Sequence, residues 1–250
     1  DQAIQLQPND ALAYNNRGNA RSALDDKQGA IADYDQAIQL QPNDALVYHN
    51  RGFARYALGD HHGAIADYDQ AIQLQPNDAL VYHNRGNARY NLGNKQGAIA
   101  DYDQAIQLQP DDAIAYNNRG LARYDLGDHQ GAIADYDQAI QLQPNDALVY
   151  HNRGFARYDL GDHQGAIADY DQAIQLQPND ALVYHNRGNA RYNLGNKQGA
   201  IADYQQAANL YQKQGKESAC QSALNQIKKL QSSTPPKNDP PNFWQRLFGG

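Results

Sequence analysis

Apolar and small residues recur along this chain in a pattern that repeats every 34 positions. In the stretch 45–78, Tyr48 and Gly52 lie four residues apart, and Ala64 and Tyr68 show the same spacing in the second half. Residues three or four apart share one face of an α-helix, so each half predicts a helix with one packing face. The pattern therefore predicts two antiparallel helices in every 34 residues.

Turn and cap residues set the ends of these helices. Asp44 precedes the first helix and Asp60 the second, where a carboxylate accepts the free N–H groups of the first turn. Gly59 supplies the left-handed residue that ends a helix, and Pro76 stops the second helix. In the first repeat Asp25 replaces this glycine, which predicts a less stable helix end there.

Self-similarity at this period indicates a stacked array, because one helix pair cannot bury its apolar face alone. Residues 1–10 look like the last part of a repeat whose beginning is missing, so a targeting or catalytic segment upstream stays an open alternative. The array is expected to span residues 1–214, with full repeats at 11–44, 45–78, 79–112, 113–146, 147–180 and 181–214.

The repeated residues resemble those of the tetratricopeptide repeat (TPR) family. The resemblance implies an all-α, right-handed superhelical solenoid of antiparallel helix pairs. It also implies that one face of the first helices lines a concave groove. The positions in family spacing are Tyr48, Gly52, Ala64, Tyr68, Ala71 and Pro76.

The pattern changes after the sixth repeat. Residues 215–231 are expected to hold a C-terminal capping helix, with Ala223, Ile227 and Leu230 on its apolar face. Residues 232–250 are typical of a flexible linker followed by an apolar tail. The apolar residues of the tail suggest self-association as an alternative role; they are Phe243, Trp244, Leu247 and Phe248.

One asparagine recurs on the groove face of every first helix. A primary amide offers both a donor and an acceptor, so a ladder of them can bind a peptide backbone without reading its side chains. The ladder resembles the asparagine ladder in the TPR superhelix of O-GlcNAc transferase, which holds extended substrate peptide. The alternative is that these residues only keep the groove polar. They are Asn16, Asn50, Asn84, Asn118, Asn152 and Asn186.

Other residues of the same stripe are candidate groove contacts. The histidines are His49, His83, His151 and His185, and we interpret them as polar surface residues rather than metal ligands, because no motif supplies further ligands. The aromatic and apolar candidates are Phe53, Leu121, Phe155, Tyr56, Tyr90, Tyr124, Tyr158 and Tyr192.

Two arginines also recur in each first helix. Arg51 is expected to face Asp67 on the partner helix, either as a structural ion pair or as a ligand-binding cation; the former is favoured. Arg55 has no partner that the sequence identifies. The carboxylate clamp of chaperone-binding TPR domains is not expected, since only its asparagines are present.

Composition excludes several classes of function. Net charge is −7, and twelve of the 21 basic residues are the repeat arginines, which leaves no basic stripe for nucleic acid. No apolar run reaches the length of a membrane span, and the single cysteine, Cys220, excludes an internal disulfide. No nucleophile–base pair or phosphate-binding loop is present, so no catalysis, cofactor or metal is expected.

The sequence thus predicts a non-enzymatic, cytoplasmic interaction scaffold. It would bind an extended peptide or a segment of a partner protein in its groove. Two alternatives stay open: the substrate-recruiting TPR region of a larger enzyme, and a self-assembling module. The identity of the partner and the oligomeric state do not follow from the sequence.

Overall fold

The computed structural model describes residues 2–232, which form α-helices joined by short turns. The predicted tail contacts of residues 243–248 lie outside the described residues. The chain divides into two compact units, residues 1–156 and 157–250, and the division falls within α10. No described helix is long and apolar enough to cross a membrane.

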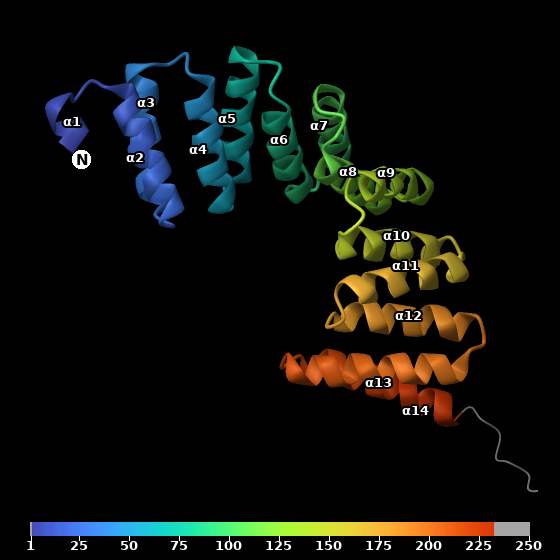
Figure 1. Ribbon diagram of the computed structural model, residues 1–250. Coiled ribbons are helices and arrows are strands. Elements are labelled where there is room, and N and C mark those ends of the chain that lie inside the picture. The colour runs from blue at the N-terminus through green and yellow to red at the C-terminus, as the bar shows by residue number, and fades with distance from the viewer. Residues whose placement is uncertain (1, 233–250) are drawn as a thin grey trace, which may run out of the picture. The chain divides into compact units, whose positions relative to one another are not determined.

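The first unit holds successive helix pairs (Figure 1). In the repeats at residues 11–146, each first helix packs against the second helix of its own repeat, and that second helix packs against the next first helix, as the pattern predicts. The helices are α1 (Gln2–Leu6), α2 (Ala11–Ala23), α3 (Lys27–Leu40), α4 (Ala45–Ala57), α5 (His61–Leu74), α6 (Ala79–Asn91), α7 (Lys95–Leu108), α8 (Ala113–Asp125), α9 (His129–Leu142) and α10 (Ala147–Asp159).

The second unit continues the same arrangement and ends on the predicted extra helix. It contains α11 (His163–Leu176), α12 (Ala181–Asn193), α13 (Lys197–Lys213) and α14 (Glu217–Ser232). With 17 residues, α13 is longer than the 14-residue second helices before it, because no proline stops it. Ala223, Ile227 and Leu230 of α14 are buried in a cluster that includes Tyr211 of α13, so α14 covers the apolar side of the last repeat.

The helix ends form at the residues that the sequence indicates. Asp44 accepts a hydrogen bond from the backbone N–H of Leu46 at 3.0 Å, and Asp60 accepts one from Gly63 at 2.9 Å. Gly59 has φ +81°, whereas Asp25 in the equivalent turn takes φ +66°. Asp25 is therefore held in a region that side chains with a Cβ disfavour.

The core of each repeat is built from alanines around one tyrosine of the second helix. Ala64, Tyr68 and Ala71 have no exposed surface. A Cβ added to Gly52 would lie 2.8 Å from the Tyr68 ring, so only glycine lets the first helix approach this ring. The small residues that the sequence places on both helices thus set how closely the pair packs.

The left-handed turn gives the first prediction. Replacing Asp25→Gly should raise the free energy of unfolding by up to about 1 kcal/mol, because glycine adopts positive φ without the Cβ clash. The reciprocal change Gly59→Asp should lower it by a similar amount. Urea unfolding of both variants measures the effect; a stabilised Gly59→Asp protein would contradict it.

Candidate functional site

A buried carboxylate joins the two helices of every repeat. Asp67 is 2% exposed and accepts two hydrogen bonds from Arg51, at 3.0 Å from Nε and 2.5 Å from Nη2. Its Oδ2 also accepts a bond from Nη1 of Arg55 at 2.8 Å. The predicted structural pair is confirmed, and the second arginine, for which the sequence suggested no partner, binds the same carboxylate.

The first arginine also links neighbouring repeats. Nη1 of Arg51 donates to Asp35 on the second helix of the preceding repeat at 2.6 Å. The sequence interpretation missed this bond, although an aspartate two residues after each buried one signals it. In the last repeat Gln205 replaces this second aspartate. The residue 16 positions later, where the other repeats have the arginine that binds it, is Gln221. Equivalent bonds join Arg85 to Asp69, Arg119 to Asp103, Arg153 to Asp137 and Arg187 to Asp171.

The asparagines of the first helices form side-chain hydrogen bonds from one repeat to the next. We call the surface that carries Asn16, Asn50, Asn84, Asn118 and Asn152 in the first unit the ladder face. Each bond joins an amide nitrogen to the residue 35 positions earlier. The partners are Asn50 and Asn15 (3.1 Å), Asn84 and His49 (2.9 Å), Asn118 and His83 (3.3 Å), and Asn152 and Asn117 (3.1 Å).

These bonds use only part of the amides of Asn50, Asn84 and Asn152, whereas the amide of Asn118 also donates to Asn87 and accepts from Asn117. Asn50 donates through its nitrogen and is half-buried, and its Oδ1 makes no hydrogen bond with the described residues. A primary amide has a second N–H and an acceptor oxygen that such a bond leaves free. Asn16 is exposed, while Asn186 in the second unit is buried. The ladder is therefore structural, and in the first unit it can still accept and donate hydrogen bonds.

The histidines lie between repeats rather than on the surface. His83 is 8% exposed, with Nε2 toward Asn118 and Nδ1 at 3.5 Å from the carboxylate of Asp112, which caps the next first helix. For His83 the surface interpretation is wrong, because the imidazole fills the space where an asparagine lies in other repeats. The nearby imidazole of His83 and the backbone N–H groups that Asp112 accepts from lower the pKa of Asp112, and burial lowers the pKa of His49.

Two of the other histidines, His49 and His185, contact core tyrosines. His185 in the second unit lies edge-on to Tyr204 at 5.4 Å between ring centroids, and burial lowers its pKa. His151 lies in α10 and is half-buried. No group of three histidine, cysteine or acidic side chains lies close enough to hold a metal ion within the described part of the chain.

The candidate groove tyrosines bond through their hydroxyl groups to the following repeat. Tyr56 accepts a hydrogen bond from Asn91 at 2.7 Å, and Tyr90 donates one to Asp125 at 2.6 Å. In the second unit Tyr158 accepts one from Asn193 at 3.0 Å, and Tyr192 is 42% exposed. These hydroxyl groups therefore stabilise the stack, while the rings remain available for contact.

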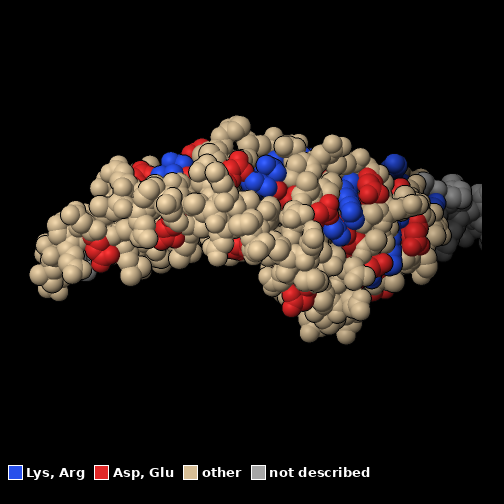
Figure 2. Space-filling view, turned by 90° about the horizontal axis from the view of Figure 1, so that it is seen from above, with Lys and Arg blue, Asp and Glu red and all other residues tan. Residues whose placement is uncertain are grey.

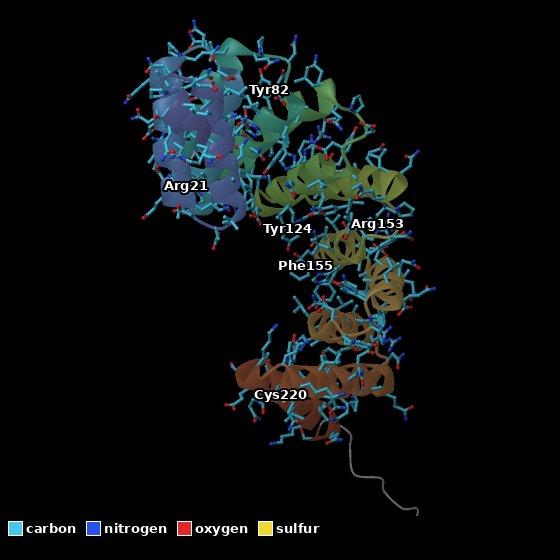
Figure 3. All side chains as sticks on the ribbon, turned by 60° about the vertical axis from the view of Figure 1, so that its left-hand side comes forward. Arg21, Tyr82, Tyr124, Arg153, Phe155 and Cys220 are labelled. Carbon is cyan, nitrogen blue, oxygen red and sulfur yellow. The ribbon has the colours of Figure 1, made fainter. Side chains whose placement is uncertain are left out.

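One position of the ladder face holds an aromatic or apolar side chain in some repeats and an asparagine in others. Phe53, Leu121 and Phe155 occupy it in three repeats of the first unit, and asparagines occupy it in the others. Phe155 packs on Tyr124 of the preceding repeat at 5.4 Å between centroids (Figure 3). A hollow of about 290 Å³ lies beside Phe53, and one of about 80 Å³ lies beside Leu121.

An exposed apolar row runs beside the asparagines in the first unit. Its side chains lie one helical turn before the ladder residues and are more than half exposed. The row follows from the 34-residue period, which places an apolar residue at the second position of each of these helices. The row comprises Leu46 (55%), Leu80 (55%), Ile114 (56%) and Leu148 (55%).

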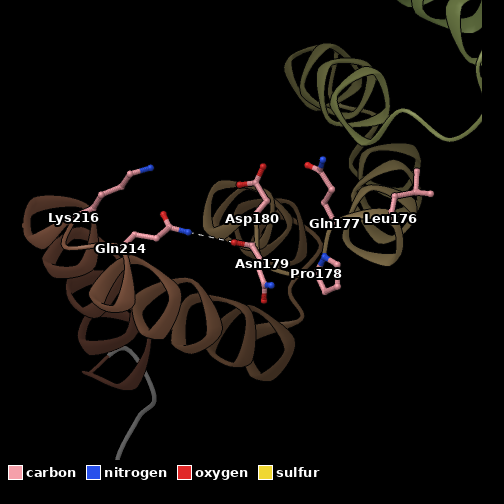
Figure 4. Close-up of a pocket in the computed structure, with 7 residues that line it drawn as sticks. All are labelled: Leu176, Gln177, Pro178, Asn179, Asp180, Gln214 and Lys216. Atoms are coloured by element: carbon pink, nitrogen blue, oxygen red, sulfur yellow. Dashed lines mark hydrogen bonds between the residues drawn. The ribbon is translucent and has the colours of Figure 1, made fainter.

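Charged residues do not form a basic surface on the face that Figure 2 shows. There, Lys and Arg side chains lie beside Asp or Glu side chains, as the ion pairs require. A hollow of about 640 Å³ in the second unit is lined by Leu176–Asp180, Gln214 and Lys216 (Figure 4). Gln214 donates across it to the carbonyl oxygen of Asn179 at 3.3 Å, and none of the predicted groove residues lines it.

Comparison with known families identifies the repeats. The model described as TPR repeat matches residues 26–59, 54–93, 86–127, 120–161 and 156–195, and the model described as tetratricopeptide repeat matches 181–214. No curated protein matches the chain.

Several solved structures are similar. One is the MamA protein, at 26% identity and a TM-score of 0.64, with 69% of this chain and 94% of that chain covered. Another is YrrB, described as a TPR protein with an unusual peptide-binding site. It matches at 22% identity and a TM-score of 0.65, with 74% of this chain and 95% of that chain covered. PilF of Pseudomonas aeruginosa matches at 17% identity and a TM-score of 0.71, with 89% of this chain and 96% of that chain covered. The last two likenesses show the fold alone.

The two aspartates of one second helix should differ in their effect on stability. Asp67→Asn should lower the free energy of unfolding by about 3 kcal/mol or more, because it leaves two arginines without a buried countercharge. Asp69→Asn removes only the bond to Arg85 from a carboxylate that is 47% exposed, and should cost about 1 kcal/mol or less. Chemical unfolding distinguishes the two variants. Equal losses in the free energy of unfolding would contradict the role of Asp67 as the buried partner of two arginines.

The half-buried His49 makes stability depend on pH. Because burial lowers its pKa below the ordinary 6.5, the unfolded chain binds a proton before the folded one. Stability should therefore fall as pH drops below about 6.5 and continue to fall to the lowered pKa of the folded state. In His49→Asn, which copies the Asn15 position, this part of the loss should disappear. Urea unfolding between pH 5 and 7.5 tests it; identical profiles would contradict it.

Proposed function

The chain belongs to the tetratricopeptide repeat family, and from that premise we propose that it is a non-enzymatic scaffold that binds an extended peptide segment along its ladder face. The observation that carries this proposal is the row of half-buried amides Asn50, Asn84 and Asn152, which donate within the stack and whose oxygens make no hydrogen bond with the described residues. An extended peptide backbone offers alternating N–H and C=O groups, which such amides can bind in pairs.

The apolar row supports the same conclusion. Leu46 and its equivalents in α6, α8 and α10 are more than half exposed, and Leu12 at the same position of the first repeat is 63% exposed. A continuous apolar strip rimmed by polar groups is typical of a surface that binds another chain. The amides would fix the backbone and the strip would receive side chains.

The similar solved structures support a binding function. YrrB is described as having a peptide-binding site, and a chain in the structure of the APC/C hetero-tetramer Cut9–Hcn1 shares the fold at 19% identity. TPR proteins are in general scaffolds without catalytic activity, which fits a chain in which no catalytic domain was recognised.

Selection from a displayed library of random peptides against the immobilised chain tests the function. We expect families of enriched peptides whose binding shifts the side-chain amide NMR signals of Asn50, Asn84, Asn118 and Asn152. Each Asn→Ala change should weaken binding a few-fold, the effect of about 0.5–1.5 kcal/mol per hydrogen bond, and the change of all four should nearly abolish it.

The bonds between repeats require a control, because Asn50→Ala also breaks the bond to Asn15. Asn15 is 3% exposed, so Asn15→Ala breaks the same bond but leaves Asn50 on the ladder face. It should weaken peptide binding less than Asn50→Ala does. If the two variants weaken binding equally, or if the quadruple variant binds at full strength while folded, the ladder does not bind the peptide.

A further inference from the structure

Two helices of the first unit differ at one position in an otherwise identical stretch. Residues 45–56 of α4 and 79–90 of α6 have the same sequence except that Phe53 replaces Asn87. Asn87 accepts a hydrogen bond from the hydroxyl of the core tyrosine Tyr102 at 2.7 Å. At the phenylalanine, the hydroxyl of Tyr68 is buried without a partner among the described residues. Phe53 is thus unfavourable for the isolated fold.

The phenylalanine is also exposed. Phe53 has 50% of its surface in contact with solvent, although the asparagine found at this position in other repeats would be both better solvated and useful to the core. A buried unsatisfied hydroxyl and an exposed aromatic ring both oppose stability. A bound ligand that covers the ring would explain why phenylalanine occupies this position.

The fourth and fifth repeats show what covers such a ring. Phe155, the equivalent of Phe53 three repeats later, packs against Tyr124 with 5.4 Å between centroids and a tilt of 45°. This is a favourable arrangement for two aromatic rings. In the first repeat the position of Tyr124 is occupied by Ser22, which is too short to reach across. Phe53 therefore lacks the aromatic partner that Phe155 has.

A hollow of about 290 Å³ occupies this place. It is lined by Ser22, Ala23, Lys27, Tyr34, Asn50 and Phe53, among others. Sites that enclose a whole small molecule measure roughly 300–1,000 Å³, so a hollow of this size suits one side chain of a larger ligand. Its lining combines two aromatic rings with the amide of a ladder residue.

A cation lies beside the hollow. Lys27 occupies the position that Lys95 has two repeats later, where the ammonium group lies 6.0 Å from the centre of the Tyr90 ring. Lys27 donates to the backbone oxygen of Ser22 and to its hydroxyl at 3.2 Å, which holds the ammonium group next to the hollow. A cation that lines a site favours an aromatic ring over an aliphatic side chain there.

We propose that the hollow beside Phe53 is an anchor site for one aromatic side chain of the bound peptide, which takes the place that Tyr124 takes against Phe155. The inference rests on the proposed function, since Asn50 would bind the backbone next to the anchored side chain. It makes Phe53 and Ser22 the residues that decide which peptides bind at this end of the ladder face.

Two variants test the anchor in opposite ways. Ser22→Tyr supplies the missing ring from within the chain, so it should fill the hollow, raise the unfolding temperature and exclude the ligand. Phe53→Asn removes the ring and gives the Tyr68 hydroxyl the acceptor that Tyr102 has, so it should also remain folded or become more stable. Both variants should lose binding without losing structure.

The probe is N-acetyl-phenylalaninamide at millimolar concentration, with N-acetyl-leucinamide and N-acetyl-asparaginamide as controls. We expect the aromatic probe alone to shift the NMR signals of the Ala23 methyl group and the Phe53 ring. The apparent affinity for the aromatic probe should fall roughly ten-fold or more in both variants. It is followed by the signals of the Phe53 ring in Ser22→Tyr and by those of the Ala23 methyl group in Phe53→Asn. Equal shifts with the leucine probe, no shift with the aromatic probe, or unchanged affinity in Ser22→Tyr would overturn the proposal.

Peptides selected on the unchanged chain separate this inference from the proposed function. If they carry an aromatic residue and lose at least ten-fold in affinity for Ser22→Tyr, both stand. If they bind Ser22→Tyr as tightly as the unchanged chain but fail on the quadruple asparagine variant, the anchor is wrong and the ladder binds peptide. If the aromatic probe binds beside Phe53 while no peptide binds, the anchor stands as an isolated site and the ladder function is wrong.

Discussion

The structure depends on a carboxylate that is buried between two arginines, and Asp67 in the second repeat is the example. Asp67 is almost fully buried and would be costly as an isolated charge, yet Arg51 and Arg55 both bind it. Arg51 then continues to Asp35 of the preceding repeat, so one guanidinium group fixes the helix pair and its neighbour together. The small core of alanines and a single tyrosine gives limited apolar burial, and the charge network supplies the orientation that this core alone does not specify.

On the ladder face, too, single residues make more than one kind of contact. Asn50 stabilises the contact with the preceding repeat through its nitrogen and leaves its oxygen free, so one residue supports both the stack and the proposed peptide contact. His49 and His83 make the same contact with an imidazole, which adds a titratable group to two of the bonds between repeats. Phe53 departs from this arrangement, because it gives up an internal hydrogen bond and exposes a ring.

Much of the fold follows from local rules. Asp44, Asp60, Gly59 and Pro76 place the helix ends, because capping, positive φ and the missing N–H of proline act within a few residues. The pairing of Arg51 with Asp67 could also be predicted, since both lie on facing stripes of one repeat. The second role of Arg51 was missed because it depends on how one repeat is placed on the next, although the aspartates that recur two residues after each buried one carry its signal.

The sequence by itself determined the helix pairs, their number, the residues that face each other within a repeat and the asparagine stripe, because these follow from period and helix geometry. Only the tertiary structure decided which groups remain unpaired after stacking. It placed His83 in the interior, used the hydroxyls of Tyr56 and Tyr90 within the stack and left the hollow beside Phe53. The physical reason is that hydrogen-bond satisfaction and cavity volume depend on contacts between repeats, and side chains 31 to 35 residues apart meet only when the repeats pack.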